Sequence, residues 1–393
     1  MTRRGAFDVV IIGAGVVGAA AALALANEGL RVAIVEAHEP KPWRAESHDL
    51  RVYAFAPDSQ TLLEALAVWP QVVAARAQPY RRMRVWDAGG GGELDFDADA
   101  LGRQCLGHIV EHGLLVDRLW AAIVADARIE RHCPERLEAL EQDADAATVT
   151  LANGQRLHAK LVLGADGATS RVRDLIGLSV TERDYGQCGV VAYVSTQHAH
   201  EDTAWQRFLP TGPLAFLPCR DGRSSIVWTL PEHEAARLLS VDDAAFCREL
   251  TRAFDARLGD VISVSTRASF PLRRQLASEM VSGRIALIGD AAHAVHPLAG
   301  QGVNLGLRDV AALRDSVRSA LADRRDFSAP HRLARWARSR SSENALAAYS
   351  FEAINAAFSN DAVLPTLLRG HALGLAGKLP MLGQFLWKRA AGL

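Results

Sequence analysis

The sequence predicts an α/β protein that combines a Rossmann-like domain, an inserted α+β domain and C-terminal helices. Two glycine-bearing motifs far apart in the chain carry this prediction, Gly13–Gly18 near the N-terminus and Gly289–His293 in the last third. Between about residues 185 and 272 the pattern changes from helix–strand alternation to a run of short strands. With 393 residues, 49% of them hydrophobic, the chain is long enough to bury the cores of two domains.

Composition excludes several classes of function. The formal net charge of -1 gives no reason to expect a nucleic-acid partner. The five cysteines lack CxxC spacing, so we interpret them as free thiols in a reducing cytoplasm and expect no metal centre. Asp8 interrupts the apolar stretch after Arg3 and Arg4, which argues against an export signal, and no apolar run has the roughly 18 residues of a membrane span.

The opening of the chain reads as strand, glycine turn, helix and strand. The strands are Phe7–Ile12 and Leu30–Val35, and the alanine-rich helix Val16–Asn27 is followed by Gly29 as a C-terminal cap. This order of elements predicts a βαβ unit.

The glycine turn fits the dinucleotide fingerprint. Gly13 permits the tight turn, Gly15 lets the backbone approach a pyrophosphate, and Gly18 allows close helix–strand packing. The phosphates then lie at the positive end of the helix, beside Ala14 and Val16. Glu36, at the end of the next strand, can accept a hydrogen bond from a ribose hydroxyl.

The middle of the chain alternates predicted helices with short strands. Asn153-Gly154 predicts a type I′ turn, and the glycine run 89–92 predicts a hairpin between Arg81–Trp86 and Glu93–Phe96. We expect helices at Asp58–Trp69, Leu114–Ala127 and Asp242–Phe254. We expect strands at Arg136–Leu140, Ala147–Leu151, Gln155–Leu163, Gly189–Val194, Ala204–Leu209, Ala215–Leu217, Ser225–Leu230, Val261–Ser269 and Ile285–Ile288, with helices after Gln301.

These elements predict a discontinuous nucleotide-binding domain. Its segments are residues 1–75, 98–182 and 275–325, the inserted domain comprises residues 76–97 and 183–274, and residues 326–393 form a C-terminal helical region.

The second glycine motif predicts a further phosphate or sugar contact. The strand Ile285–Ile288 leads to Gly289 and Asp290, and the Asp290 carboxylate can bind a hydroxyl of a sugar or ribityl chain; the alternative is a plain helix cap. Pro297–Gly302 is expected to open a helix whose N–H groups stabilise negative charge on a reduced flavin ring. A nicotinamide dehydrogenase needs only the first motif, so the pair of motifs favours a flavin dinucleotide.

A third motif spans Gly164–Arg173, where a strand ends in Asp166 and Gly167 before a short helix. Taken alone, Asp166 is equally well interpreted as the cap of that helix.

With these three motifs the chain resembles the flavin-dependent aromatic hydroxylases related to p-hydroxybenzoate hydroxylase, and within them the ubiquinone-biosynthesis hydroxylases of the UbiH/UbiF/VisC type. The closer resemblance extends to about residue 360 and depends on four segments: His48–Ala54, Tyr185–Gln187, Ala204–Pro213 and His296–Gly306.

The resemblance implies a role for each matching residue. Gly13, Gly15, Gly18 and Glu36 would bind the ADP half of FAD, and Arg51 would contact its phosphates. Asp166 and Gly167 match the motif shared by FAD and NAD(P)H, which visits transiently because the chain has no second GxGxxG. Arg118 is a further FAD contact or, equally well, a solvated helix arginine. The remaining implied cofactor contacts are Gly289, Asp290, Gly300, Gly302, Val303 and Asn304.

The resemblance also implies the reaction. NAD(P)H would reduce FAD, and the flavin C4a-hydroperoxide formed with O₂ would hydroxylate an aromatic ring. Pro297, Gly300, Gln301 and His296 would lie at the flavin edge, and His293 or His296 could move a proton or be purely structural. The substrate pocket is predicted at Phe208, Leu209, Phe216 and Pro218, although ordinary core is an alternative for each.

The expected substrate is a polyprenylated phenol on the route to ubiquinone. One rival is a hydroxylase of a small soluble phenol, for which Arg207 is the visible cation; another is a flavoprotein scaffold in a complex with other ubiquinone-biosynthesis proteins. The apolar tail 361–393, with interspersed Lys and Arg, is either an interfacial membrane helix of a cytoplasmic protein or a segment that docks on its own core or on another subunit of a homo-oligomer.

Overall fold

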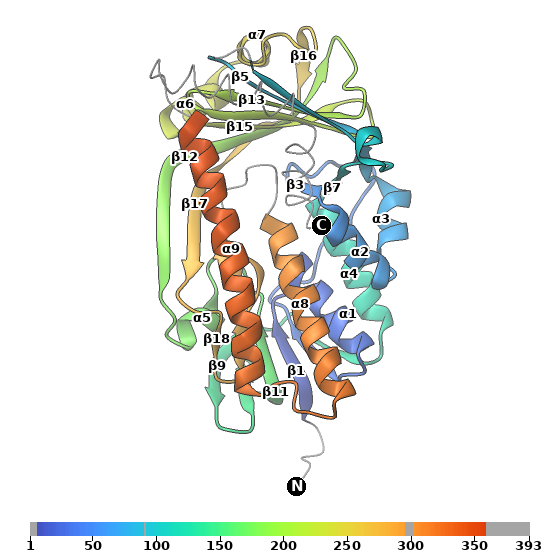
Figure 1. Ribbon diagram of the computed structural model, residues 1–393, viewed down its shortest axis with the longest axis vertical. Helices are drawn as coiled ribbons and strands as arrows, with labels where there is room; N and C mark the ends of the chain where they lie inside the picture. Colours follow the sequence, from blue (N-terminus) through green and yellow to red (C-terminus); the bar gives the residue numbers. More distant parts are fainter. Residues whose placement is uncertain (1–5, 90–91, 295–301, 359–393) are drawn as a thin grey trace.

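The computed structural model describes residues 6–89, 92–294 and 302–358. The molecule is elongated: a mixed sheet with its helices forms the lower body in Figure 1, and a second sheet lies across the top. The predicted α/β class, with a Rossmann-like part and an α+β part, is therefore the observed one.

The first sheet carries the βαβ unit. Strands β1, β2, β8, β11 and β19 run parallel, so their carboxyl ends lie at one edge. In spatial order the strands are β18 (Val281–Ser282), β19 (Ile285–Leu287), β11 (Arg156–Gly164), β1 (Phe7–Ile12), β2 (Val32–Val35) and β8 (Ile129–His132), with β10 (Ala147–Leu151) and β9 (Leu137–Gln142) added antiparallel beside β11.

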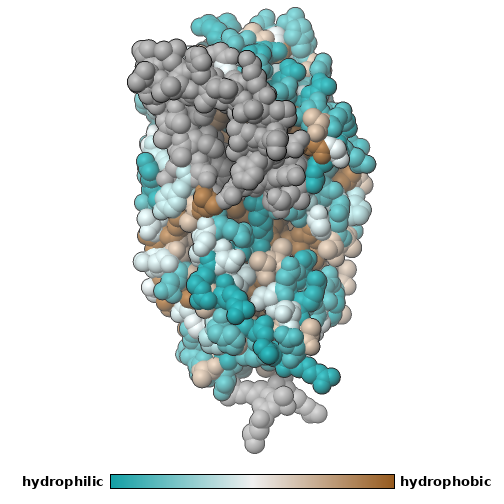
Figure 2. Space-filling view, viewed as in Figure 1, coloured by the Kyte–Doolittle hydropathy of each residue, from teal (hydrophilic) through white to brown (hydrophobic). Residues whose placement is uncertain are grey.

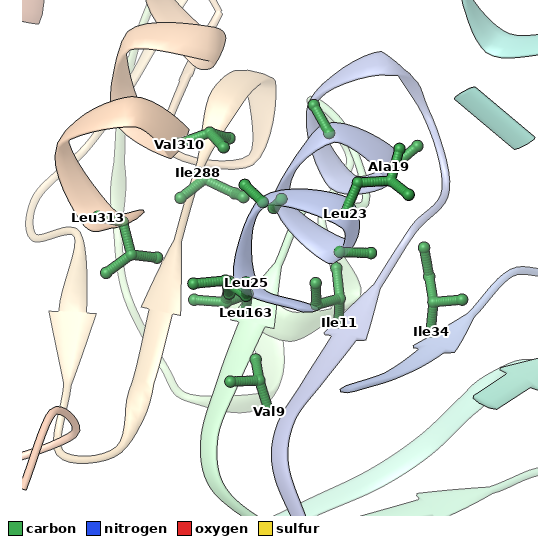
Figure 3. Packing of buried hydrophobic residues seen from close by; sticks show 14 of the residues in the cluster. Val9, Ile11, Ala19, Leu23, Leu25, Ile34, Leu163, Ile288, Val310 and Leu313 are labelled. Atoms are coloured by element: carbon green, nitrogen blue, oxygen red, sulfur yellow. The ribbon is translucent and has the colours of Figure 1, made fainter. Parts of the chain in front are cut away.

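Helix α1 (Val16–Asn27) is buried along almost its whole length. It contacts α4 (His112–Ala125) on one side and α8 (Gly302–Ala322) on the other, which explains its run of alanines. Figure 3 shows Leu23 and Leu25 of α1 within the same core as Ile11 and Leu163 of the sheet and Val310 and Leu313 of α8. Helix α9 (Pro330–Phe358) packs on α8 at the outside of the body (Figure 1).

The second sheet is predominantly antiparallel, and helices α6 (Glu232–Ser240) and α7 (Asp243–Ala253) cover one of its faces. Its strands are, in order, β20 (His293–Ala294), β17 (Ala268–Ala277), β12 (Val180–Thr196), β15 (Ser224–Pro231), β14 (Gly212–Pro218), β13 (Thr203–Leu209), β5 (Arg82–Asp87) and β6 (Glu93–Asp97), with β16 (Val261–Val264) beside β12. Strands β12 and β17 reach down towards the first sheet in Figure 1.

A three-stranded sheet formed by β3, β7 and β4 lies between the two larger parts (Figure 1). Its strands are β3 (Val52–Phe55), β7 (Gly107–Glu111) and β4 (Gln78–Tyr80). The remaining short elements are α2 (Pro57–Ala65), α3 (Trp69–Ala75), α5 (Arg171–Leu175) and the 3₁₀ turns η1 (Asp99–Leu101) and η2 (Gly289–Ala291).

Two element predictions and one turn type were wrong. The predicted type I′ turn needs a positive φ at both Asn153 and Gly154, but of the two only Gly154 has one, at 85°. The expected helix 58–69 ends at Ala65, because Ala67 has a left-handed φ of 57°, and a separate helix begins at Trp69 with Pro70 in its first turn. The expected strand 261–269 is also two, since β16 pairs with residues 194–196 of β12 whereas β17 pairs with residues 180–191. The domain bounds stay a prediction, although β5 and β6 of residues 76–97 pair with β13 of the second sheet.

The face shown in Figure 2 is mostly hydrophilic at its lower end, with apolar surface gathered at mid-height. Within the described ranges, no helix combines the length and apolar character that crossing a membrane requires.

Candidate functional site

A cavity of about 700 Å³ opens where the parallel strands of the first sheet end. The loops that follow β1, β2, β11 and β19 all reach it, as expected for the ligand site of a parallel α/β sheet. Of the residues predicted to bind the cofactor, it is lined by Gly13, Gly15, Val16, Glu36, Arg51, Asp166, Gly167, Asp290 and Val303.

The three glycines of the first motif have different surroundings. A Cβ on Gly13, where φ is +100°, would lie 2.5 Å from the Ala165 carbonyl oxygen, and one on Gly18 would lie 2.1 Å from the Gly13 oxygen. These two glycines are required by the protein's own packing. A Cβ on Gly15 would meet no atom within 4 Å, so the free space there faces the cavity.

Gly15 is also the N-cap of α1, and no side chain caps that helix. Its first-turn N–H groups and the positive end of its dipole are therefore directed at the cavity wall, which suits a phosphate.

The Glu36 carboxylate is oriented by the backbone. It accepts hydrogen bonds from Ala14 N at 2.7 Å and from His38 N at 3.1 Å. Ala14 itself does not line the cavity; its role is to hold Glu36. A carboxylate has lone pairs beyond these two bonds, so Glu36 can still accept from a ligand hydroxyl.

Asp166 contacts the start of α5 and also lines the cavity. It accepts hydrogen bonds from Ser170 Oγ at 2.5 Å and from Val172 N at 3.0 Å at the start of α5, while it also lines the cavity. Arg173 of the same helix donates to the Ala291 carbonyl at 3.0 Å, which ties the third motif to the second.

The second motif places Asp290 between two cavities, because its side chain lines both. Gly289 has φ +60°, and a Cβ there would come within 3.2 Å of Val17, so this glycine serves the packing of the loop on α1. Asn304, which the resemblance placed beside the flavin, is 2% exposed and lines neither cavity. Its amide accepts from Ala56 N and donates to the Ala54 carbonyl, both at 2.9 Å, so it joins α8 to β3.

His293 is buried and contacts neither cavity. Its Nε2 lies 2.5 Å from Asp309 Oδ2 in α8. Of the two interpretations of this histidine, the structural one therefore fits its surroundings.

Arg51, Tyr53 and His112 form a polar group on the cavity wall that sequence reasoning largely missed. The Arg51 guanidinium lies over the Tyr53 ring, 5.4 Å from its centroid, and the Tyr53 hydroxyl is 2.9 Å from His112 Nδ1. Burial, with a contribution from Arg51, lowers the pKa of His112 to about 4, so the imidazole is neutral at pH 7. When Tyr53 donates to Nδ1, the Nε2–H remains as a donor to a ligand. Neither spacing nor composition pointed to His112, because β7 brings it to the wall only through its pairing with β3.

Arg118 is not part of the cavity lining. It donates to Asp117 at 2.9 Å and lies 5.8 Å from the centroid of the Trp43 ring. This placement favours the alternative that it is an ordinary helix arginine.

A second cavity, of about 510 Å³, lies between the first site and the second sheet. Arg51, Tyr53, Asp290 and Val303 line both cavities, so the two spaces meet at these residues. Gly302, at the start of α8, lines the second cavity. Its remaining lining is Asp49, Leu50, Val52, Val191, Gln206, Pro213, Ala215, Leu217, Val227, Thr229, Ala268, Phe270 and Ala294.

The predicted pocket residues Phe208, Leu209, Phe216 and Pro218 do not line this cavity, so these predictions were wrong. Phe216 points to the other face of β14, where its ring stacks on Phe254 with centroids 3.7 Å apart. Successive strand residues face opposite sides, so Ala215 and Leu217 reach the cavity while Phe216 and Pro218 do not. Phe208 packs with Val85, and Leu209 packs against the core beneath α6 and α7.

Arg207 does not reach the second cavity either. Its guanidinium donates to the Ala253 carbonyl at 2.9 Å and to the Arg252 carbonyl at 3.3 Å, at the C-terminal end of α7. The cation proposed for an acidic soluble substrate is therefore engaged elsewhere.

Four predicted residues, His296, Pro297, Gly300 and Gln301, lie outside the described residues, as does the tail 361–393. Gly90 and Gly91 of the predicted hairpin turn do so too.

The chain is similar to proteins of known function. The family described as FAD binding domain matches residues 6–331. The chain is 37% identical over 387 residues to the 3-demethoxyubiquinol 3-hydroxylase of Escherichia coli (strain K12), with 98% of each chain covered. It is 36% identical over 385 residues to the ubiquinone hydroxylase UbiL of Rhodospirillum rubrum, covering 98% of this chain and 89% of that protein. The chain belongs to the family of FAD-dependent ubiquinone hydroxylases.

The fold of this ubiquinone hydroxylase family member has solved counterparts. It matches the p-nitrophenol 4-monooxygenase PnpA from Pseudomonas putida DLL-E4 with a TM-score of 0.79 over 98% of both chains, at 19% identity, a likeness of fold. The predicted p-hydroxybenzoate hydroxylase-like architecture is thus confirmed. The protein is an FAD-dependent aromatic monooxygenase, and NAD(P)H is the reductant typical of its class.

Proposed function

We propose that this hydroxylase acts on the ring of a polyprenylated phenol in the biosynthesis of ubiquinone. The residues of the first cavity would hold FAD, and those of the second cavity would hold the phenol ring. The single observation that carries this proposal is that Arg51, Tyr53, Asp290 and Val303 line both cavities, so a ring system placed there touches cofactor space and substrate space together.

Residues of the first cavity suit the polar half of FAD. The uncapped start of α1 at Gly15 would hold the pyrophosphate, and Glu36 would accept from the ribose hydroxyls. Asp290 would bind the ribityl chain, while Arg51 and the neutral His112 would donate to phosphate or ring oxygens. When bound, the flavin supplies the redox chemistry and the activation of O₂.

The protein's own contribution is to position the ring and exclude water. The positive end of α8 begins at Gly302, beside the junction, where it would stabilise negative charge on a reduced ring. Apolar side chains of the second sheet, such as Leu217 and Val227, would keep water from the reacting carbon.

The charge of the second cavity favours a neutral phenol over an acidic soluble substrate. Among its described lining residues Arg51 is the one cation, and two carboxylates, Asp49 and Asp290, line the same cavity. An additional substrate carboxylate would therefore meet a wall without surplus positive charge. The engagement of Arg207 at the end of α7 points the same way.

The test is NAD(P)H oxidation by the purified flavoprotein, with and without matched phenols, combined with mass analysis of the product. A prenylated phenol that stimulates oxidation and gains one oxygen atom supports the proposal. If only soluble phenols stimulated NAD(P)H oxidation, the protein would be a hydroxylase of a small soluble phenol. NAD(P)H oxidation without a hydroxylated product would favour a flavoprotein scaffold in a biosynthetic complex.

We also propose that residues 361–393 bring the enzyme to the membrane as a peripheral protein. The support is compositional: apolar residues interspersed with Arg369, Lys378, Lys388 and Arg389, in a protein whose proposed substrate resides in lipid. Removing residues 361–393 should abolish binding to anionic liposomes; unchanged binding by the shortened protein would refute this part.

A further inference from the structure

Two polar side chains lie on the otherwise apolar sheet wall of the second cavity. Gln206 of β13 is 8% exposed and Thr229 of β15 is 3% exposed, and both line the cavity. The rest of this wall is apolar: Val191, Pro213, Ala215, Leu217 and Val227.

The register of the sheet explains why both point the same way. Gln206 is opposite Ala215, and Ala215 is opposite Val227. Thr229 follows Val227 by two residues, so it returns to the same face two strands away from Gln206. Gln206 and Thr229 therefore lie at two separate positions on the same face of the sheet.

Within the described part of the chain, neither side chain makes a hydrogen bond to another residue. Two other polar side chains of the same sheet do have partners: Gln187 donates to the Thr211 carbonyl at 2.9 Å, and Thr203 donates to the Glu201 carbonyl at 3.0 Å. Their polar atoms are not among the fully buried atoms that lack a partner, so they are accessible from the cavity. A ligand that displaces water from them must itself offer a hydrogen-bond partner, because an amide or hydroxyl left unpaired is unfavourable.

We propose that Gln206 and Thr229 determine specificity by hydrogen-bonding oxygen substituents on the ring of the substrate. This inference rests on the proposed function, since it concerns the same cavity. The Gln206 amide and the Thr229 hydroxyl can each donate and accept, so a phenol hydroxyl or an aryl ether oxygen satisfies them, whereas a ring carrying only hydrogen or alkyl groups leaves them unpaired.

Their position separates this role from cofactor binding. Neither residue lines the first cavity, whose wall carries the proposed FAD contacts. Substitution should therefore change the choice of phenol and leave the FAD content unchanged.

The experiment uses the full-length holoenzyme with Gln206→Leu, Thr229→Val and the double variant, all close in volume to the original side chains. Ser225→Ala is the matched control, because this buried hydroxyl of β15 also lacks a hydrogen-bond partner among the described residues but lies outside the cavity lining. Phenol binding is followed by the change in flavin absorbance for two matched pairs, one prenylated and one not. The two members of each pair differ in that one hydroxyl substituent on the ring of the first is replaced by hydrogen in the second.

The wild type should prefer the more oxygenated member of the pair on the order of tenfold. Each single variant should reduce that preference, the double variant should abolish it, and Ser225→Ala should retain it. FAD content checks the fold of each variant, and either single variant suffices if the other fails to fold.

An unchanged preference in the variants, an equal loss in Ser225→Ala, or a wild type without preference would overturn the inference. Failure of the proposed function has a different signature: the wild type would bind only the pair without prenyl groups, and the preference within that pair would still decide the role of Gln206 and Thr229.

Discussion

The imidazole Nε2 of His293 lies 2.5 Å from the carboxylate Oδ2 of Asp309, and both side chains are almost completely buried. The same oxygen accepts from Gly289 N at 3.1 Å. The other oxygen of Asp309 accepts from Arg340 Nε at 2.9 Å and from Asn344 Nδ2 at 3.2 Å. One carboxylate thereby joins the second glycine motif to α8 and α9.

Because Asp309 holds several elements together, Asp309→Asn should destabilise the protein by about 3 kcal/mol, the range found when one partner of a buried ion pair is removed. His293 would be left as a buried group without its counter-charge, and Arg340 would keep Glu343 alone as its carboxylate partner among the described residues. Chemical denaturation monitored by circular dichroism measures the change.

The control is Asp315→Asn on the same helix, where the exposed carboxylate pairs with Arg314 at 2.9 Å. It should alter the free energy of unfolding by less than about 0.5 kcal/mol. Equal effects of the two substitutions would mean that Asp309 does not join these elements.

The stability contributed by this pair should fall as the pH rises above neutrality. Burial alone would lower the pKa of His293, but the Asp309 carboxylate, helped by Asp290, outweighs burial and raises it. A group with a raised folded pKa contributes fully below its ordinary value of 6.5 and loses that contribution as the pH rises through the folded pKa. The slope for one proton is at most about 1.4 kcal/mol per pH unit.

At acidic pH the stability that Asp309 contributes changes in the opposite direction, since it decreases as the pH falls. Burial alone would raise the pKa of Asp309, but His293 and Arg340 outweigh burial and lower it, so its contribution is lost only as the pH falls through that lowered value. Denaturation of the wild type and His293→Gln at about pH 6, 7 and 8 should show a difference that shrinks with rising pH. If the difference in free energy of unfolding between the two proteins did not change with pH, His293 would not be protonated in the folded protein.

Two glycines of the first motif should respond differently to a methyl group. Gly15→Ala should fold with normal stability, since the new Cβ meets no atom within 4 Å and the backbone φ of -63° suits alanine. It should nevertheless weaken FAD binding on the order of tenfold, because the methyl group occupies the space proposed for the pyrophosphate.

Gly18→Ala should instead destabilise the apoprotein, because its Cβ would lie 2.1 Å from the Gly13 oxygen. Thermal unfolding of the apoproteins and FAD titration separate the two effects. Normal FAD affinity in Gly15→Ala would show that the pyrophosphate does not bind beside Gly15.

The two arginines that the resemblance connected with FAD should differ as well. Arg51→Ala should weaken FAD binding by about 10- to 100-fold, since it would remove a charge-assisted contact at the junction of the cavities. Arg118→Ala, the matched control, should leave the affinity unchanged because Arg118 lies outside the cavity lining. Fluorescence titration with FAD measures both, and a loss in Arg118→Ala alone would reverse the assignment.

Local chemistry explains which parts of the site could be predicted from the sequence. Gly13, Gly15 and Glu36 act within one βαβ unit, where short-range geometry determines what each position can do. The sequence was less informative for β14. The alternation of side chains along a strand puts Phe216 and Leu217 on opposite faces of the sheet, but it does not say which face lines a cavity.

The parallel βαβ core and each glycine motif could be read from the sequence alone, because each depends on residues close together in the chain, and the two motifs taken together indicated the class of cofactor. Only the tertiary structure decided which side of the second sheet α6 and α7 cover, and hence that Gln206 and Thr229 face the open side. It also decided that Asp309 meets His293 and Arg340, since burial and charge pairing depend on elements distant in the chain that are brought together only by packing.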